Sequence, residues 1–137
     1  MDTRDAVTYL LHAEREIRGY YTLSAGSIAR AEATGPVARR APDPVPVILL
    51  GRMAVDKRYQ SQGYGSEMLR HAIGQALSAA TTVGARCFLV HALNDSAQVF
   101  YSARGFDVSP ITPHLLMLPF KDIEQTYAPT DAEGQAS

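Results

Sequence analysis

The middle of the chain carries an almost unbroken apolar run, residues 45–55, and few folds accommodate such a run. Continuous apolar character is typical of a central strand that other parts of the chain cover on both faces. Gly51 lies inside the run, which indicates a bulge or a close backbone approach. A chain of 137 residues fits one domain, so we predict a single layered domain with helices packed on a sheet.

Apolar spacing predicts further elements on both sides of this strand. Residues 65–82 carry apolar side chains three and four residues apart, as one face of a helix does, and Gly84 can cap its end. Glycines and prolines at 26–46 predict a loop, the most mobile internal segment. Shorter patterns predict a hairpin from strands at 7–11 and 17–25, and further strands at 85–92, 106–108 and 115–118. They also predict a helix that begins at Asn94 or Asp95 and ends near Gly105.

Composition excludes several classes of protein. The formal net charge of -1 gives no global signal for nucleic acid, and no apolar stretch is long enough to span a membrane. The single cysteine, Cys87, rules out a disulfide framework within the chain, and its apolar surroundings predict a buried side chain rather than a nucleophile or a metal ligand. The polar N-terminus carries no apolar signal region, so we expect a cytoplasmic protein without a membrane anchor.

A glycine-rich turn, residues 60–65, joins the central strand to the long helix. At a helix start several backbone N–H groups have no intrahelical acceptor, and together with the positive end of the helix dipole they bind phosphate oxygens. Gly63 and Gly65 allow such a ligand to approach the backbone closely. The turn matches neither a Walker loop nor G-x-G-x-x-G, and taken alone it is equally compatible with a tight turn that binds nothing.

A second pattern, N-D-S-A-Q-V-F-Y-S-A-R-G-F at residues 94–106, follows the next predicted strand. Together with the turn at 60–65 it resembles the GNAT acetyltransferase superfamily, in which Q/R-x-x-G-x-G/A is followed by N-x-x-A-x-x-F-Y-x-x-x-G-F. Both patterns match at every fixed position, within a resemblance that covers residues 17–119. The family implies acetyl-CoA as the cofactor and an α/β (α+β) fold, whose mixed and mostly antiparallel sheet has splayed central strands flanked by helices.

The resemblance implies where acetyl-CoA binds. The end of the central strand pairs with the pantetheine arm, and the glycine-rich turn offers backbone N–H groups to the pyrophosphate. Tyr101 matches the catalytic tyrosine near the acetyl sulfur, where its phenol gives a proton to the departing thiolate. The alternative for Tyr101 is a core tyrosine with its hydroxyl at the surface. The implied cofactor-binding residues are Met53, Ala54, Val55, Gln60, Gln62, Gly63, Tyr64, Gly65, Ser66 and Asn94.

The family mechanism implies direct attack by the acceptor amine, with a backbone N–H of the splayed strand stabilising the oxyanion. No acidic residue is an evident general base. His91 and Asp95 follow the strand at 85–92 closely and are candidates, although the alternative for His91 is a structural histidine. An acceptor amine of low pKa needs no strong base.

One branch of the superfamily, the toxin acetyltransferases of bacterial toxin–antitoxin pairs, is more similar still. Residues 19–28, 44–56 and 116–119 resemble its G-Y-Y-x-L-x-x-G-S-V, P-x-P-V-x-x-L-G-R-L-A-V-D and L-M-L-P segments. The resemblance implies acetylation of the α-amine of aminoacyl-tRNA and a ribbon-helix-helix antitoxin as partner. The amine of an aminoacyl ester is less basic than a lysine, which agrees with the missing base. The basic residues expected at tRNA phosphates are Arg30, Arg39, Arg40, Lys57 and Arg58.

The family fold begins with a strand and one or two helices, which have no counterpart before the hairpin here. We expect residues 1–125 to form one GNAT domain that lacks part of this N-terminal region, and residues 126–137 to form a disordered polar tail. A homodimer partner is one way to cover the sheet face that the missing region leaves open. Two other functions stay open: an N-acetyltransferase of small amines, and a non-catalytic short form that binds coenzyme A or an antitoxin.

Overall fold

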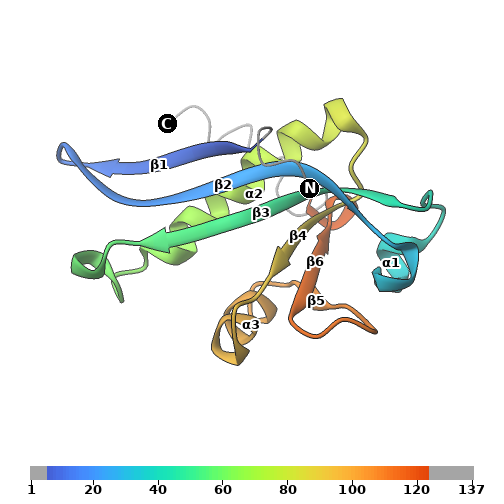
Figure 1. Ribbon diagram of the computed structural model, residues 1–137. Coiled ribbons are helices and arrows are strands. Elements are labelled where there is room, and N and C mark those ends of the chain that lie inside the picture. The colour runs from blue at the N-terminus through green and yellow to red at the C-terminus, as the bar shows by residue number, and fades with distance from the viewer. Residues whose placement is uncertain (1–5, 124–137) are drawn as a thin grey trace.

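The computed structural model describes residues 6–123, which form a six-stranded sheet flanked by helices (Figure 1). The strand order is β1-β2-β3-β4-β6-β5, and every neighbouring pair is antiparallel except β3 and β4. The predicted mixed, mostly antiparallel sheet is therefore confirmed, whereas the predicted tail at 126–137 lies outside the described residues. The strands are β1 (Val7–Ala13), β2 (Glu16–Ile28), β3 (Val45–Val55), β4 (Cys87–His91), β5 (Asp107–Val108) and β6 (Leu115–Pro119); the helices are α1 (Gly35–Ala38), α2 (Tyr64–Val83) and α3 (Asp95–Ser102), with 3-10 turns η2 (Arg30–Glu32) and η3 (Lys57–Tyr59).

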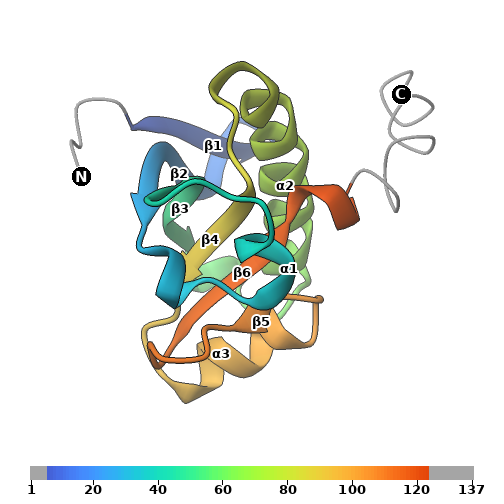
Figure 2. The ribbon, with the colours of Figure 1, turned by 90° about the vertical axis from the view of Figure 1, so that its right-hand side faces the viewer.

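The long helix α2 covers one face of the sheet and builds the larger core (Figure 2). Its buried positions follow the predicted spacing, and Gly84 caps its end in the left-handed conformation with its N–H bonded to the carbonyl of Ala80. Although α2 has 20 residues, no helix within 6–123 is long and apolar enough to cross a membrane. The core under α2 includes Leu23, Leu50, Met68, Leu69, Ile73, Phe88, Val90, Phe106 and Leu116.

A second core lies on the opposite face and corrects one prediction. The segment 26–46 is not an open loop, because β2 continues to Ile28 and the short elements η2 and α1 follow. Pro36 lies in the first turn of α1, where its missing N–H costs nothing. Val37 is then buried against the sheet, together with Val45, Val47, Cys87, Leu89 and Met117. The apolar residues between the prolines therefore cover the second face.

The two central strands separate halfway along their length. β3 pairs with β4 only from Val47 to Leu50, opposite Cys87 to Val90. Beyond that point β3 continues to Val55 against β2, while β4 ends at His91 against β6. Figure 1 shows β3 and β4 running apart from each other. The predicted splay is confirmed, and it leaves one edge of β3 without a strand partner.

A bulge marks the point of separation. Thr22 pairs with Arg52 and Leu23 with Leu50, so Gly51 has no opposite residue on β2. The hydroxyl of Thr22 accepts a hydrogen bond from the backbone N–H of Arg52 at 3.0 Å. The predicted bulge at Gly51 is confirmed, and the backbone there is held by one threonine side chain.

Substitution of Gly51 by alanine is expected to lower the free energy of unfolding by about 1–3 kcal/mol. A Cβ at this position would lie 2.6 Å from the hydroxyl oxygen of Thr22, which must then release the Arg52 N–H. Gly74→Ala is the matched control, because a Cβ there meets no atom within 4 Å and the change should stabilise α2. Urea unfolding measures both variants, and an equal effect of the two would refute the constraint at the bulge.

Cys87, the first residue of β4, is fully buried in the second core, as predicted. Burial raises the pKa of its thiol to about 12. At pH 8 only about one protein molecule in ten thousand then carries the reactive thiolate. We expect no reaction of the native protein with Ellman's reagent and one equivalent in urea. Rapid reaction of the native protein would mean that the second core opens readily.

Candidate active site

The gap between β3 and β4 forms a cleft of about 480 Å³. One wall is the unpaired part of β3, and the other is the end of β4 with the residues that follow it. Helix α3 contributes Tyr101, a lining side chain that can carry chemistry. The lining residues are Tyr20, Leu50, Gly51, Arg52, Met53, Ala54, Val90, His91, Ala92, Leu93, Ala97 and Tyr101.

Tyr101 is held rigidly and keeps its proton. Its ring packs edge-on against Phe100 and Phe106, with centroids 5.2 Å and 5.5 Å away, and the residue is only 8% exposed. No residue within 6–123 forms a hydrogen bond to its hydroxyl, although the residue lines the cleft. Burial raises the pKa of this phenol, so it is protonated at neutral pH. The position of Tyr101 agrees with both interpretations of the sequence, the catalytic tyrosine and the core tyrosine, because its ring belongs to the core and the residue lines the cleft.

A second recess, of about 270 Å³, lies at the start of α2. Gly63 caps the helix with φ +86°, a conformation that favours glycine. Glu67 is the first residue of α2 whose N–H reaches a backbone carbonyl, that of Gly63, so the N–H groups of Gly65 and Ser66 remain available to a ligand. The recess is lined by Val55, Tyr59, Gln60, Ser61, Gly63, Gly65, Ser66 and Phe100.

β3 connects the cleft with the second recess. Met53 and Ala54 line the cleft, and the next residue, Val55, lines the recess. None of the described residues that line either hollow is acidic, and the guanidinium of Arg104 bonds to Ser66 Oγ at 2.6 Å beside the recess. An elongated ligand with an anionic end at α2 and a neutral arm along β3 therefore fits this path.

Three predicted binding residues, of which Gln62 and Tyr64 are expected to bind through backbone N–H groups, have side chains that bond within the protein. Asn94, rather than Asp95, is the N-cap of α3, and its side-chain oxygen accepts from Ala97 N at 2.8 Å. The amide of Gln62 donates to the carbonyl of Arg58, and the hydroxyl of Tyr64 bonds to Arg18. None of the three lines the cleft or the recess. By contrast, Gln60 lines the recess, and its amide donates to the carbonyl of Val55 at 3.1 Å, which closes the turn.

The two candidate bases differ in position. His91 lines the cleft at the end of β4, whereas Asp95 is 96% exposed and pairs with His114 Nε2 at 2.7 Å. The sequence patterns missed Tyr20, Arg52 and Leu93 as cleft residues, and Arg104 beside the recess. Of these four residues, only Arg52 could have been identified from the sequence, because it directly follows Gly51, where a bulge is predicted.

Four of the five basic residues expected at tRNA phosphates divide into two groups; the fifth, Lys57, is exposed in η3 and forms no ion pair within 6–123. Arg58 is paired with Glu16 and Asp56, and Arg30 donates to the carbonyl of Ala38, so neither guanidinium is free. Arg39 and Arg40 line a separate recess of about 660 Å³ near α1, with Arg86, Lys121 and one carboxylate, that of Asp122. No ion pair within 6–123 involves these four cations.

The arrangement of a splayed sheet, a glycine-rich turn at the start of α2 and a tyrosine at the cleft has a family counterpart. Residues 6–108 match the family described as "Acetyltransferase (GNAT) domain". The chain belongs to this family. As a GNAT domain it has the predicted fold, and the match includes the whole of β3, the turn, α2 and Tyr101.

Similar proteins refine this assignment. This GNAT domain is 53% identical over 104 residues to a tRNA-acetylating toxin of Mycobacterium tuberculosis, a match that covers 76% of the chain but only 63% of the toxin. Its fold resembles AtaT complexed with acetyl-methionyl-tRNAfMet at a TM-score of 0.80 and 31% identity, covering 91% of this chain and 77% of AtaT. It also resembles a mutant AtaT toxin bound to the C-terminus of the antitoxin AtaR and acetyl-CoA, at a TM-score of 0.71 and 32% identity, covering 88% and 71%.

Proposed function

We propose that this GNAT domain is an acetyl-CoA-dependent N-acetyltransferase of the toxin type, acting on the α-amine of aminoacyl-tRNA. The observation that carries the proposal is the path along β3 from the recess at α2 to Tyr101. The 53% identity to a tRNA-acetylating toxin supports tRNA as the substrate class. The neighbour in complex with an acetylated tRNA supports it further.

The cleft between β3 and β4 and the recess at the start of α2 together fit acetyl-CoA in shape and charge. The free N–H groups at Gly65 and Ser66 suit the pyrophosphate, and the unpaired edge of β3 at Met53 and Ala54 suits the amide-bearing pantetheine arm. Acetyl-CoA supplies the acetyl group as an activated thioester. Tyr101 holds a proton on its phenolic oxygen where β3 and β4 separate, and we assign it as the general acid of the reaction.

The acceptor side favours an amine that is already neutral. His91 is the one imidazole among the described residues that line the cleft, and no carboxylate lines it. The α-amine of an aminoacyl ester is less basic than a lysine side chain and needs little help from a base. The recess of Arg39, Arg40, Arg86 and Lys121 offers unpaired cations to tRNA phosphates outside the cleft.

The remaining assignments follow from the substrate. Charged tRNA is found in the cytoplasm, so we assign the protein to that compartment. The antitoxin bound to the AtaT neighbour suggests an antitoxin partner here, for which we propose the ribbon-helix-helix class. We also propose a homodimer as the way to cover the face of β1 and β2 on which Leu10 is 49% and Ile17 50% exposed.

Transfer of labelled acetate from acetyl-CoA to bulk charged tRNA tests the proposal directly. We expect label in the tRNA fraction only when the tRNA is aminoacylated, and its loss in Tyr101→Phe. Deacylated tRNA and a polyamine serve as acceptor controls. Label on the polyamine but not on tRNA would replace the proposal by a small-amine acetyltransferase, and no label despite coenzyme A binding would leave a non-catalytic form.

A further inference from the structure

Arg18 occupies a second bulge of the sheet, between β1 and β2. Leu11 pairs with Gly19 and His12 with Ile17, which leaves Arg18 without an opposite residue. A bulge re-aims the side chain that it carries. Although this hairpin lies at the sheet edge, the Arg18 side chain is only 12% exposed.

The re-aimed guanidinium lies against the turn that precedes α2. Its Cζ is 4.3 Å from the ring centroid of Tyr59 and 5.5 Å from that of Tyr64. Its Nη1 donates to the hydroxyl of Tyr64 and its Nη2 to Glu14 at 3.4 Å, whereas Nε is buried and has no hydrogen-bond partner among residues 6–123. The backbone carbonyl of Arg18 also accepts the N–H of Asp56 at 2.8 Å. Arg18 therefore contacts the beginning, the middle and the end of the segment 56–64.

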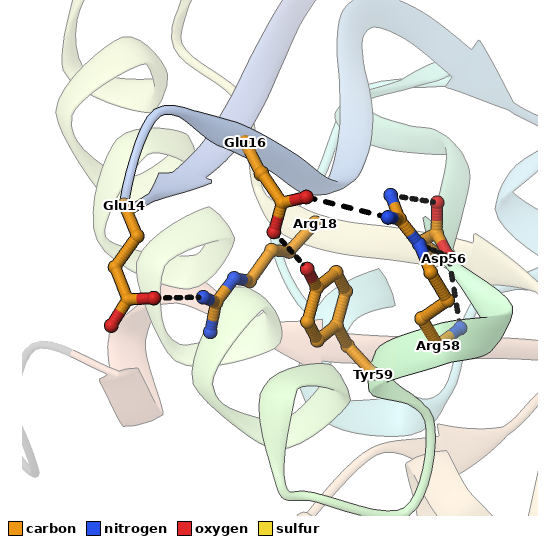
Figure 3. A network of polar contacts seen from close by, with 6 residues as sticks. All are labelled: Glu14, Glu16, Arg18, Asp56, Arg58 and Tyr59. Atoms are coloured by element: carbon orange, nitrogen blue, oxygen red, sulfur yellow. Dashed lines mark hydrogen bonds and ion pairs between the residues drawn. The ribbon is translucent and has the colours of Figure 1, made fainter.

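Further polar contacts join the hairpin to the turn beside this arginine (Figure 3). Glu16 accepts the hydroxyl of Tyr59 and pairs with Arg58 at 3.3 Å, and Arg58 in turn pairs with Asp56 at 3.2 Å. Figure 3 shows Arg18 beside the Tyr59 ring, with Glu14 on one side and the Glu16–Arg58–Asp56 group on the other. The hairpin and the turn are thus joined by several independent contacts.

We propose that Arg18 is a positioning residue that holds the pyrophosphate-binding turn in its binding-competent shape. The proposal rests on acetyl-CoA as the cofactor in the proposed function. The turn contains Gly63 and Gly65, which give its backbone conformational freedom. If the turn were disordered before binding, the ligand would have to order it, and this would cost affinity. Contacts that fix the turn in advance avoid this cost and keep the N–H groups directed at the phosphate. Arg18 lines neither the cleft nor the recess, so it acts through Tyr59 and Tyr64 rather than on the ligand.

Arg18→Ala, compared with Arg70→Ala, tests this role. Arg70 is exposed on α2, so its removal costs the same charge without touching the turn. In hydrogen–deuterium exchange without ligand, we expect the amides of residues 59–66 to exchange about tenfold faster in Arg18→Ala only. By calorimetry, we expect the Kd for coenzyme A to rise about tenfold, with kcat for acetyl transfer unchanged and the KM for acetyl-CoA raised.

Two milder variants keep the test valid if Arg18→Ala folds poorly. Arg18→Lys keeps the charge but loses the flat group that stacks on Tyr59, so its Kd should lie between wild type and Arg18→Ala. Tyr64→Phe removes only the acceptor hydroxyl and should raise the Kd. Tyr9→Phe is the control, because Tyr9 stacks on Tyr21 at a centroid distance of 4.8 Å and does not contact the turn. Lower thermal stability with unchanged turn exchange and unchanged Kd would overturn the proposal in favour of a purely structural arginine. Failure of the wild type to bind coenzyme A would refute acetyl-CoA as the cofactor. Hydrogen–deuterium exchange without ligand would still show whether Arg18 orders the turn.

Discussion

Tyr101→Phe is expected to lower the kcat of acetyl transfer by about 10²–10⁴-fold, the usual contribution of a general acid. The change removes one hydroxyl and keeps the ring, so the contacts with Phe100 and Phe106 persist. Because the proton is needed only in the transition state, the Kd for coenzyme A should stay within about twofold. Steady-state kinetics with charged tRNA and calorimetry with coenzyme A measure the two quantities separately.

The pH profile gives an independent check on Tyr101. A general acid works protonated, so activity falls as pH rises through its pKa. Burial raises that pKa in the free protein above the ordinary 10.0, which moves the basic limb of the kcat/KM profile above pH 10. We expect full activity at pH 9 in the wild type and no such limb in Tyr101→Phe. Tyr9→Phe, on the α2 face of the hairpin, should match the wild type. An unchanged kcat in Tyr101→Phe would leave this residue a role in packing alone.

The parts of the fold that depend on nearby residues could be predicted from the sequence. The spacing in α2, its Gly84 cap and the bulge at Gly51 each reflect a local pattern, and all three are confirmed. The segment 26–46 could not be predicted in the same way, because Val37 is ordered by contact with strands that lie far away in the sequence. Frequent glycine and proline indicate breaks in regular structure, but they do not indicate whether the chain between them is buried.

The same limit applies to the site. The turn at 60–65 and Tyr101 stand out by motif, yet the motif does not reveal that Asn94 caps α3 or that Arg58 is paired with two carboxylates. Arg18 gave no signal at all, since its role follows from a one-residue register shift between β1 and β2. Strand register depends on the whole sheet, so residues re-aimed by a bulge are identified only once the pairing is known.

Replacement of Gly65 by valine is expected to cause a large loss of affinity for coenzyme A. A Cβ there would lie 3.9 Å from the Phe100 ring, so the protein itself has room for a side chain. That side chain would, however, occupy the recess between the turn and Phe100, where the pyrophosphate is proposed to bind. Gly65→Val should therefore leave the fold intact and weaken coenzyme A binding about a hundredfold, or about 2.7 kcal/mol. Gly65→Ala should have a smaller effect, because the family pattern accepts alanine here.

Gly74→Val separates the blocked recess from any general effect of valine in α2. Gly74 lies on the same helix, and a Cβ there meets no atom within 4 Å. Both substitutions change helix propensity in the same direction, so urea unfolding should give similar free energies for the two. Calorimetry should then show wild-type affinity for Gly74→Val and the hundredfold loss for Gly65→Val. Equal affinity in the two variants would mean that phosphate does not bind at the start of α2, and the proposed cofactor path along β3 would lose its anionic end.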